Sequence, residues 1–436
     1  MAVQKPREIA ARILLRRLEG EDFVENILDD ELARANLSPP DRGLCQEIVY
    51  GVVRWQATLD WLIARKTQKR AQHAPLHILL QLGLYQMLWL ERIPDHAAVH
   101  ETVELGRKMG FNSQSGFLNA VLRAYTREKE ATKTLLQEMK VKDPAIGYSQ
   151  PQWLVEKWKT RFGVEKTSQL LEWNNTPPKT YARVNSLKTN AEDLARQWTD
   201  EGVKFIARDF PWTEAKLVFE LESHPSIATL PSFQQGFFYI QDPSTLLSVY
   251  ELNPQREETV LDFCAAPGGK TTFIAQLMQN RGKIVAQDVR ARLGLIRENY
   301  IRLGVVCADA VAVPETFNGS DSPTASRQFD RILVDSPCSN TGVLRRRVDL
   351  RWRLRRDEMV RLRETQLQIL RQSAARLKSG GTLVYSTCSL EPEENSGVVK
   401  AFLSEHPQFN LERERELLPF DDGVDGAYVA KLILAK

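Results

Sequence analysis

Cysteine and long apolar runs are scarce in this sequence, and each absence excludes a class of protein. The 436 residues include five cysteines, and no two of them form a Cys-x-x-Cys pair. We therefore expect neither a disulfide framework nor a metal site, and we expect a reducing compartment. No stretch has the length and apolarity of a membrane span, and residues 1–8 lack the apolar core of a signal peptide. The sequence predicts a soluble, cytoplasmic protein.

A strong excess of charge and an internal repeat are also missing. Lysine and arginine number 59 and acidic residues 56, which gives a formal net charge of +3. A polyanionic partner would therefore have to bind local basic patches. A chain of 436 residues is too long for one ordinary core, so we expect two or three domains.

Apolar periodicity divides the chain into three predicted domains. Residues 1–140 follow a helical pattern, and residues 76–90 are apolar nearly all round, as in the central helix of a bundle. Residues 141–235 read as a small α/β segment. Residues 236–436 alternate strand-like and helical runs, which predicts a Rossmann-like α/β domain. Its strand-like runs are 237–241, 259–263, 283–288, 305–308, 329–335, 381–386 and 428–434.

A turn rich in glycine and small residues follows the strand-like run 259–263. A helical stretch begins near Thr271, and the turn between consists of Cys264, Ala265, Ala266, Pro267, Gly268, Gly269 and Lys270. In an open parallel sheet, such a turn directs backbone N–H groups at a ligand beyond the strand end. The turn therefore predicts a cofactor site.

Aspartates end three successive strand-like runs. Asp288 lies about 20 residues beyond the glycine turn, where dinucleotide-binding folds place an acid on the ribose hydroxyls. Asp309 and Asp335 end the next two runs. Each aspartate alone could equally be a helix cap or a turn former. Together they predict three carboxylates at the sheet edge where the turn opens.

The same turn has a second interpretation. Gly269, Lys270 and Thr271 match the end of a phosphate-binding Walker A loop, but Cys264 replaces the first glycine of that motif. Carboxylates near the turn would repel a triphosphate in the absence of Mg²⁺. They suit a nucleoside with free ribose hydroxyls and a cationic centre, such as S-adenosylmethionine. A P-loop ATPase is the alternative.

Two cysteines lie just beyond predicted strands and could converge on one substrate atom. Cys338 follows Asp335 by three residues, and Cys388 follows the run 381–386. A thiolate that adds to carbon 6 of a cytosine makes carbon 5 nucleophilic enough to accept a methyl group. A carboxyl group hydrogen-bonded to ring N3 would support the charge that builds during addition. Cys45 and Cys307 are expected to be inert buried thiols.

Three motifs together resemble the RNA cytosine-5 methyltransferases of the NOL1/NOP2/Sun family. They are Cys-Ala-Ala-Pro-Gly-Gly-Lys at 264–270, Asp-Ser-Pro-Cys-Ser at 335–339 and Ser-Thr-Cys-Ser at 386–389. Residues 1–140 resemble a NusB-type RNA-binding domain, and Arg183-Val184-Asn185 matches a pattern of the family's middle segment. With that N-terminal domain, the chain is most similar to bacterial enzymes that methylate 16S ribosomal RNA. The resemblance implies S-adenosylmethionine as cofactor and small-subunit ribosomal RNA as partner, either naked or partly assembled, and we expect a monomer.

The resemblance also implies roles for individual residues. Residues 264–270 would hold the methionine moiety, Asp288 the ribose and Asp309 the adenine, and Asp335 would lie between cofactor and cytosine. The implied nucleophile is Cys388, and Cys338 would assist product release. Because a paired base hides carbon 6, the cytosine would have to be unstacked. A non-catalytic RNA-binding protein with a vestigial methyltransferase fold is a further alternative.

Two other features have open interpretations. The stretch Arg345 to Arg355 is rich in arginine around Trp352, which suits phosphate contacts and base stacking or simply a solvated basic helix start. His96 and His100 have the spacing of a metal pair on a helix, but a solvated helix face is expected because no third ligand is evident.

Overall fold

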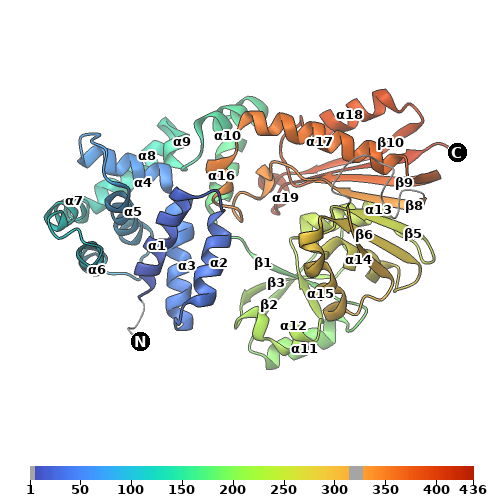
Figure 1. The fold of residues 1–436 in the computed structure, drawn as a ribbon, viewed down its shortest axis with the longest axis horizontal. Coiled ribbons are helices and arrows are strands. Elements are labelled where there is room, and N and C mark those ends of the chain that lie inside the picture. The colour runs from blue at the N-terminus through green and yellow to red at the C-terminus, as the bar shows by residue number, and fades with distance from the viewer. Residues whose placement is uncertain (1–4, 314–327) are drawn as a thin grey trace. The chain divides into compact units, whose positions relative to one another are not determined.

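The computed structural model describes residues 5–313 and 328–436 of the chain, which is drawn in Figure 1. The chain forms two compact units. Unit 1 consists of residues 1–176 and 344–354, and unit 2 consists of residues 177–343 and 355–436. These units do not coincide with the three domains predicted from the sequence, whose boundaries stay a prediction. Residues 318–327 are polar and contain glycine and proline, which predicts a surface loop, and they lie outside the described residues.

Unit 1 is helical, as its periodicity predicts. Among the described residues it contains α1 (Pro6–Glu19), α2 (Val24–Arg34), α3 (Pro39–Arg54), α4 (Gln56–Lys66), α5 (Ala74–Trp89), α6 (Asp95–Lys108), α7 (Ser115–Arg127), α8 (Lys129–Lys142), α9 (Pro144–Gly147), α10 (Gln152–Asn175) and α16 (Leu350–Arg353). Helix α5 is buried along most of its length and contacts α1, α3, α4, α6 and α7. It is therefore the central helix that the apolar stretch 76–90 predicted.

The first sheet of unit 2 is small and antiparallel. Within the described residues its order is β2-β3-β1-β4, formed by β1 (Thr180–Val184), β2 (Lys204–Arg208), β3 (Val218–Ser223) and β4 (Phe238–Ile240). Helix α11 (Ala191–Asp200) packs on it through Trp198, whose ring lies 5.2 to 5.4 Å from three phenylalanine rings of these strands. The prediction that 237–241 belongs to the large sheet was wrong, because β4 pairs with β1 instead. Helices α12 (Pro231–Gln234) and α13 (Leu246–Leu252) flank β4 in sequence.

The second sheet of unit 2 has the order β10-β11-β9-β8-β5-β6-β7 within the described residues. Its strands are β5 (Thr259–Phe263), β6 (Lys283–Asp288), β7 (Ala308–Ala312), β8 (Phe329–Asp335), β9 (Leu377–Thr387), β10 (Phe409–Leu417) and β11 (Ala427–Leu434). Strands β7, β6, β5, β8 and β9 are parallel, and β11 pairs antiparallel with both β9 and β10. This mixed sheet is the core of the Rossmann-like α/β domain that the sequence predicts.

Helices cover both faces of this sheet (Figure 1). Helices α17 (Arg356–Ala374) and α18 (Ser396–Glu405) lie on one face, while α13, α14 (Gly269–Leu277) and α15 (Leu293–Leu303) lie on the other. Successive residues of the central strands therefore enter opposite cores. Leu333 belongs to the core under α13 and α14, whereas Val334 belongs to the core under α17 and α18. This burial on both faces explains why these strands read as continuous apolar runs. The short helix α19 (Pro419–Asp422) precedes β11.

Two strands of the large sheet differ from prediction. Strand β7 spans Ala308–Ala312 instead of 305–308, so the predicted run precedes the strand. Strand β10 has no counterpart among the predicted strands, because its central residues are charged and exposed. It lies at the sheet edge, where charged side chains discourage pairing with another chain.

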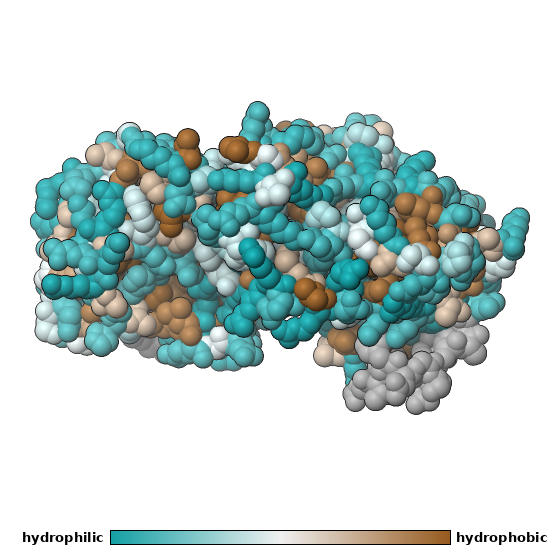
Figure 2. Space-filling model, turned by 90° about the horizontal axis from the view of Figure 1, so that it is seen from above, coloured by the Kyte–Doolittle hydropathy of each residue, from teal (hydrophilic) through white to brown (hydrophobic). Residues whose placement is uncertain are grey.

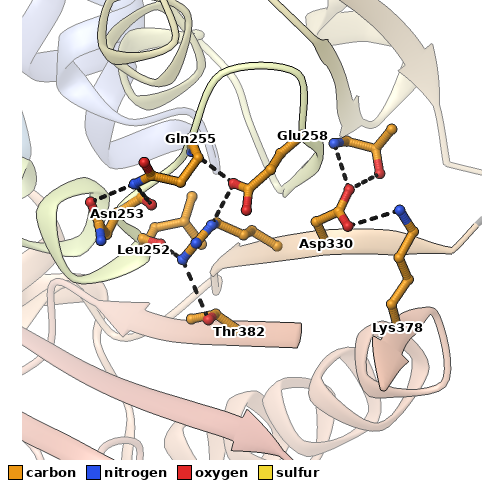
Figure 3. Close-up of polar contacts among 9 residues, drawn as sticks. Leu252, Asn253, Gln255, Glu258, Asp330, Lys378 and Thr382 are labelled. Atoms are coloured by element: carbon orange, nitrogen blue, oxygen red, sulfur yellow. Dashed lines mark hydrogen bonds and ion pairs between the residues drawn. The ribbon is translucent and has the colours of Figure 1, made fainter. Parts of the chain in front are cut away.

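The amino-terminal end of β8 is fixed by polar contacts, shown in Figure 3. Asp330 accepts hydrogen bonds from the backbone N–H and the hydroxyl of Thr259 at 2.8 and 2.7 Å, and it pairs with Lys378 at 2.8 Å. The next residue, Arg331, pairs with Glu258 at 2.6 Å. These contacts tie β8 to its neighbours β5 and β9 at the sheet edge opposite the glycine turn.

Apolar side chains are dispersed on the surface. The face drawn in Figure 2 is largely hydrophilic, with small and separate apolar groups. None of the helices in the described part of the chain is both long and apolar enough to span a membrane.

Candidate active site

The predicted glycine turn connects β5 to α14. Cys264 and Gly268 have left-handed backbone conformations, with φ of +63° and +99°. A Cβ atom at Gly269 would lie 2.7 Å from the ring of Tyr239, so glycine is required there for close packing. The first N–H groups of a helix have no intrahelical partner. The sequence thus places donor groups of α14 at the carboxyl end of the sheet.

A buried arginine from the small sheet supports this turn. Arg183 is 1% exposed and donates to the Gly269 carbonyl at 2.9 Å and to the Thr272 hydroxyl at 3.1 Å. Its guanidinium also lies over the ring of Phe273, 4.7 Å from the ring centre. Burial lowers the pKa of Arg183 to about 9. The small sheet of unit 2 therefore holds the beginning of α14 in place.

Asp288 lies where the sequence predicts it, at the end of β6. Its carboxylate accepts the backbone N–H groups of Ala266 and Val289, both at 2.8 Å. It thereby fixes the middle of the glycine turn. Each carboxylate oxygen retains further acceptor capacity, which is the chemistry that ribose hydroxyls require.

Asp309 does not end a strand, contrary to the prediction. It is the second residue of β7 and lies opposite Val285, whereas Asp288 lies opposite Ala312. A rise of about 3.3 Å per residue puts Asp309 roughly 10 Å short of the edge that carries Asp288. Its carboxylate is 64% exposed and lies 3.7 Å from Lys283. Of the three carboxylates predicted at this edge, only Asp288 and Asp335 therefore lie there.

Asp335 and Lys270 form an ion pair at the carboxyl end of β8. The Lys270 ammonium lies 2.5 Å from one Asp335 oxygen, and the Ser386 hydroxyl donates to the other at 2.9 Å. Burial opposes the charge on Lys270, but the Asp335 carboxylate outweighs this effect and raises the pKa of Lys270. The pair joins the glycine turn to β8 and β9. It is a proton donor and an acceptor held side by side.

The two predicted cysteines meet at this edge. The sulfur atoms of Cys338 and Cys388 are 3.4 Å apart, and the Cys388 thiol lies 3.1 Å from Oδ1 of Asn340. The hydrogen bond to Cys388, followed by burial, raises the pKa of Cys338 well above its usual value. No disulfide joins any of the five cysteines, all of which lie in the described residues.

Several polar residues around the cysteines were not singled out from the sequence. Asn340 contacts Cys388, and Ser339, Gln366 and Ser389 surround the buried carboxylate of Glu394. Serine, asparagine and glutamate are common in turns and at helix starts. Such a residue stands out only when it is known to be buried. Burial of a loop residue leaves no periodic pattern in the sequence, so these residues could not be identified from it.

A third aspartate, Asp262 on β5, lies beneath the glycine turn. It is fully buried, and the Thr271 hydroxyl donates to one of its oxygens at 2.5 Å. Its other oxygen has no hydrogen-bond partner within the described part of the chain. Burial is the largest effect on this group and, with the nearby charge of Asp335, raises the pKa of Asp262 to about 7 against the hydrogen bond from Thr271.

Most of the arginine-rich stretch at 345–355 is buried or half-buried. Residues 344–354, which we call the strap, belong to unit 1. Arg345 is 2% exposed and stacks on Trp173, and Arg351 is fully buried. The Trp352 indole N–H donates to the Val53 carbonyl at 2.7 Å. Arg347 and Arg355 are exposed, and Arg346 and Arg353 are half-buried. The buried Arg345 and Arg351 are therefore not solvated, whereas RNA contact by the exposed arginines stays a prediction.

The residues at the carboxyl edge fit the cofactor that the sequence suggested. Backbone N–H groups at the start of α14 suit a carboxylate, and the acceptors of Asp288 suit ribose hydroxyls. A Cβ atom at Gly268 would lie in ordinary contact with Ile296, at 3.5 Å, so it is the φ of +99° that favours glycine there. Among the described residues no cluster of three or more histidines, cysteines or carboxylates could hold a metal. His96 and His100 line a groove of about 700 Å³ between α6 and α7.

The sequence matches three known families in succession. Residues 4–127 match the NusB family, and residues 150–215 match a ferredoxin-like domain described as Methyltr_RsmF/B-like. Residues 249–433 match the family described as 16S rRNA methyltransferase RsmB/F.

Curated relatives align over nearly the whole chain. A Bacillus subtilis (strain 168) protein named probable ribosomal RNA small subunit methyltransferase B is 37% identical, over 98% of each chain. Proteins named ribosomal RNA small subunit methyltransferase B are 35% identical in Escherichia coli O1:K1 / APEC and 34% identical in Vibrio vulnificus (strain YJ016). These alignments cover 98% of this chain and 98% and 99% of the relatives.

Solved structures share the fold. The crystal structure of a protein called PH0851 aligns over 99% of both chains with a TM-score of 0.79 and 24% identity. A methyltransferase homologue from Pyrococcus horikoshii is 31% identical, with a TM-score of 0.58 over 67% of this chain and 98% of its own.

Proposed function

The chain belongs to the ribosomal RNA small subunit methyltransferase B family, and from this premise we propose that it methylates carbon 5 of a cytosine through a covalent cysteine adduct. The proposed substrate is small-subunit ribosomal RNA, and the proposed methyl donor is S-adenosylmethionine. Membership of this family is incompatible with the P-loop ATPase alternative.

One observation carries the proposal. Two thiols lie 3.4 Å apart at the sheet edge where Lys270 and Asp335 form an ion pair. Addition of sulfur to a pyrimidine requires a thiolate near carbon 6 and a group that stabilises the charge displaced onto the ring. Both are present on adjacent strands, β8 and β9, beside the glycine turn.

The surroundings of the two thiols support Cys388 as the nucleophile. Cys338 is 8% exposed, and its raised pKa keeps it a protonated thiol at neutral pH. Cys388 is more exposed and lies beside the Asn340 amide. A nucleophile must reach its substrate as a thiolate, whereas a protonated thiol can donate or exchange a proton.

In the proposed reaction, the Cys388 sulfur forms a bond to carbon 6 and the ring becomes an enamine. Lys270 and Asp335 can hold or move a proton at ring N3, where charge builds during addition. The residues that would hold S-adenosylmethionine are 264–270 and Asp288, and the bound cofactor supplies an electrophilic methyl group. Once carbon 5 carries the methyl group, a base accepts its proton and the electron pair restores the ring double bond. The bond between carbon 6 and the Cys388 sulfur then breaks and releases a thiolate, and Cys338 assists this release.

Bisulfite sequencing of small-subunit ribosomal RNA tests the proposal. Bisulfite converts cytosine but spares 5-methylcytosine. RNA from a deletion strain should lose protection at one cytosine, and the wild-type gene should restore it. A C388A gene should not. Identical bisulfite maps from the parent and the deletion strain would refute the proposal.

A further inference from the structure

Glu394 is a buried carboxylate that contacts both cysteine-bearing loops. It lies in the turn between β9 and α18 and is 0% exposed. Its Oε1 accepts the backbone N–H of Ser339 at 2.8 Å and the side-chain amide of Gln366 at 3.0 Å. Its Oε2 accepts the hydroxyl of Ser339 and, at 2.6 Å, the hydroxyl of Ser389. Four donors therefore satisfy one carboxylate.

Two of these donors belong to residues that are adjacent in sequence to the two cysteines. Ser339 directly follows Cys338, and Ser389 directly follows Cys388. The two hydroxyls lie 3.1 Å apart and bind the same carboxylate oxygen. One atom of Glu394 thus joins the residues next to both thiols, whose sulfur atoms are 3.4 Å apart.

Further contacts make this a closed network. The Gln366 amide also donates to the Pro337 carbonyl at 2.9 Å, which extends the network to the residue before Cys338. The Tyr385 hydroxyl donates to the Glu394 carbonyl at 2.6 Å, which anchors the turn on β9. Hydrogen bonds to a buried charged acceptor are stronger than neutral ones, and well-connected polar networks hold one geometry.

We propose that Glu394 is a positioning residue that sets the distance between the nucleophilic thiol and the thiol that assists release. The proposal rests on the proposed roles of Cys388 and Cys338. Without the carboxylate, four donors in two loops lose their common acceptor, and the loops are free to separate. The thiols would then occupy the reactive arrangement for a smaller fraction of the time.

The distance between the thiols can be measured without methylation. In glutathione buffers, Cys338 and Cys388 form one S–S bond as oxidised glutathione takes up their two hydrogens and becomes two reduced molecules. The equilibrium constant is the effective concentration of one thiol at the other, and peptide mass spectrometry identifies the pair. For E394A we expect an effective concentration at least about 10-fold below that of the wild type, because loss of orientation lowers effective concentration steeply.

E394Q is the conservative variant. A glutamine keeps the shape of the side chain, accepts through its oxygen and donates to the two serine hydroxyls, which can also act as acceptors. Because these hydrogen bonds can be kept, we expect the effective concentration of one thiol at the other in E394Q to stay within about threefold of the wild type. In a methylation assay, kcat should fall about 100-fold in E394A because a misplacement of 1 Å has an effect of that size, with KM for the RNA retained. E394Q should recover most of this loss.

Two further variants are controls that distinguish a local effect of Glu394 from a general loss of folding. S389A removes one hydroxyl and should give a loss smaller than that of E394A. D330N removes a carboxylate at the opposite edge of the same sheet, and it should leave the thiol equilibrium unchanged. If E394A keeps the wild-type effective concentration, or if D330N lowers it equally, Glu394 is not a positioning residue. A wild-type protein that fails to methylate cytosine would contradict the proposed function, while the thiol equilibrium would still test Glu394.

Discussion

The two cysteines of the proposed active site are in contact through their sulfur atoms but have different surroundings. The hydrogen bond to Cys388, followed by burial, raises the pKa of Cys338, whereas Cys388 is the more exposed of the two. The proposed mechanism requires this difference, because addition at carbon 6 needs an accessible thiolate. Release of the product needs a group that donates or accepts a proton.

Single substitutions of these cysteines should therefore fail in opposite ways. C388A removes the nucleophile, so neither methylation nor an adduct is expected. C338A retains addition but slows release, so a covalent protein–RNA complex should accumulate. Denaturing gel electrophoresis with labelled RNA detects that complex. A complex trapped by C388A in place of C338A would reverse the assignment.

Asp262 should make the stability of unit 2 depend on pH. Its pKa is about 7 in the folded protein, above the value of about 3.9 expected for an unfolded chain. Between these values the folded state binds a proton that the unfolded state lacks, so unfolding free energy falls as pH rises and levels off above about 7. D262N removes this dependence. Urea unfolding measures the unfolding free energy at pH 5 and at pH 8. From pH 5 to pH 8 this free energy should fall more in the wild type than in D262N, and equal changes in the two proteins would contradict the prediction.

At the scale of elements, the strap shows why an arginine-rich stretch can be buried. Arg351 donates to the Arg54 carbonyl at 3.3 Å, where α3 ends, and to the Asn174 carbonyl at 2.8 Å, near the end of α10. The last carbonyls of a helix lack intrahelical partners and attract cations. A guanidinium satisfies several such groups at once. Burial nevertheless lowers the pKa of Arg351 to about 9.

Replacement of Arg351 should destabilise unit 1. In R351M the volume is nearly kept, but the carbonyls at the ends of α3 and α10 lose their donor. We expect a loss of about 3 kcal/mol, because each buried polar group without a partner costs about 1–3 kcal/mol. Urea unfolding measures the loss, and hydrogen exchange should place it in residues 1–176 and 344–354. The matched control is R347M, whose exposed side chain should change stability by less than about 0.5 kcal/mol. Equal effects of the two variants would contradict the role of the strap.

At the scale of the whole molecule, the chain passes between the units three times. The passages occur at residues 176–177, 343–344 and 354–355. The strap begins only a few residues after Cys338, so the loop that carries this thiol continues directly into unit 1. Val348 and Trp352 of the strap belong to the helical core of that unit.

A separated unit 2 should therefore be poorly soluble. A fragment of residues 177–436 retains the strap but lacks the helices against which it packs. Val348 and Trp352, which pack in the helical core of unit 1, would then face solvent. We expect aggregation on size-exclusion chromatography, and recovery when residues 344–354 are replaced by a glycine–serine linker. A fragment as soluble as the full chain would show that the strap does not need unit 1.

The sequence alone determined most of the elements and the sheet edge at which the proposed chemistry takes place. Helical periodicity located α5, and short continuous apolar runs located β5, β6 and β8, because those strands are buried on both faces. Parallel strands end at the same edge of a sheet, so Asp335, Cys338 and Cys388 could be brought together from their positions after strands. The resemblance to a family then ranked the two thiols, which spacing alone could not do.

The tertiary structure decided which partner each element meets. Periodicity shows that a side chain is buried but not what it is buried against. Strand β4 therefore pairs within the small sheet, and the register of β7 places Asp309 away from the edge. For the same reason Arg345 and Arg351 of the strap are buried. The same holds for Glu394, which reads as an ordinary polar turn residue. Its role depends on donors from loops about 50 residues apart, and such pairing is a property of packing.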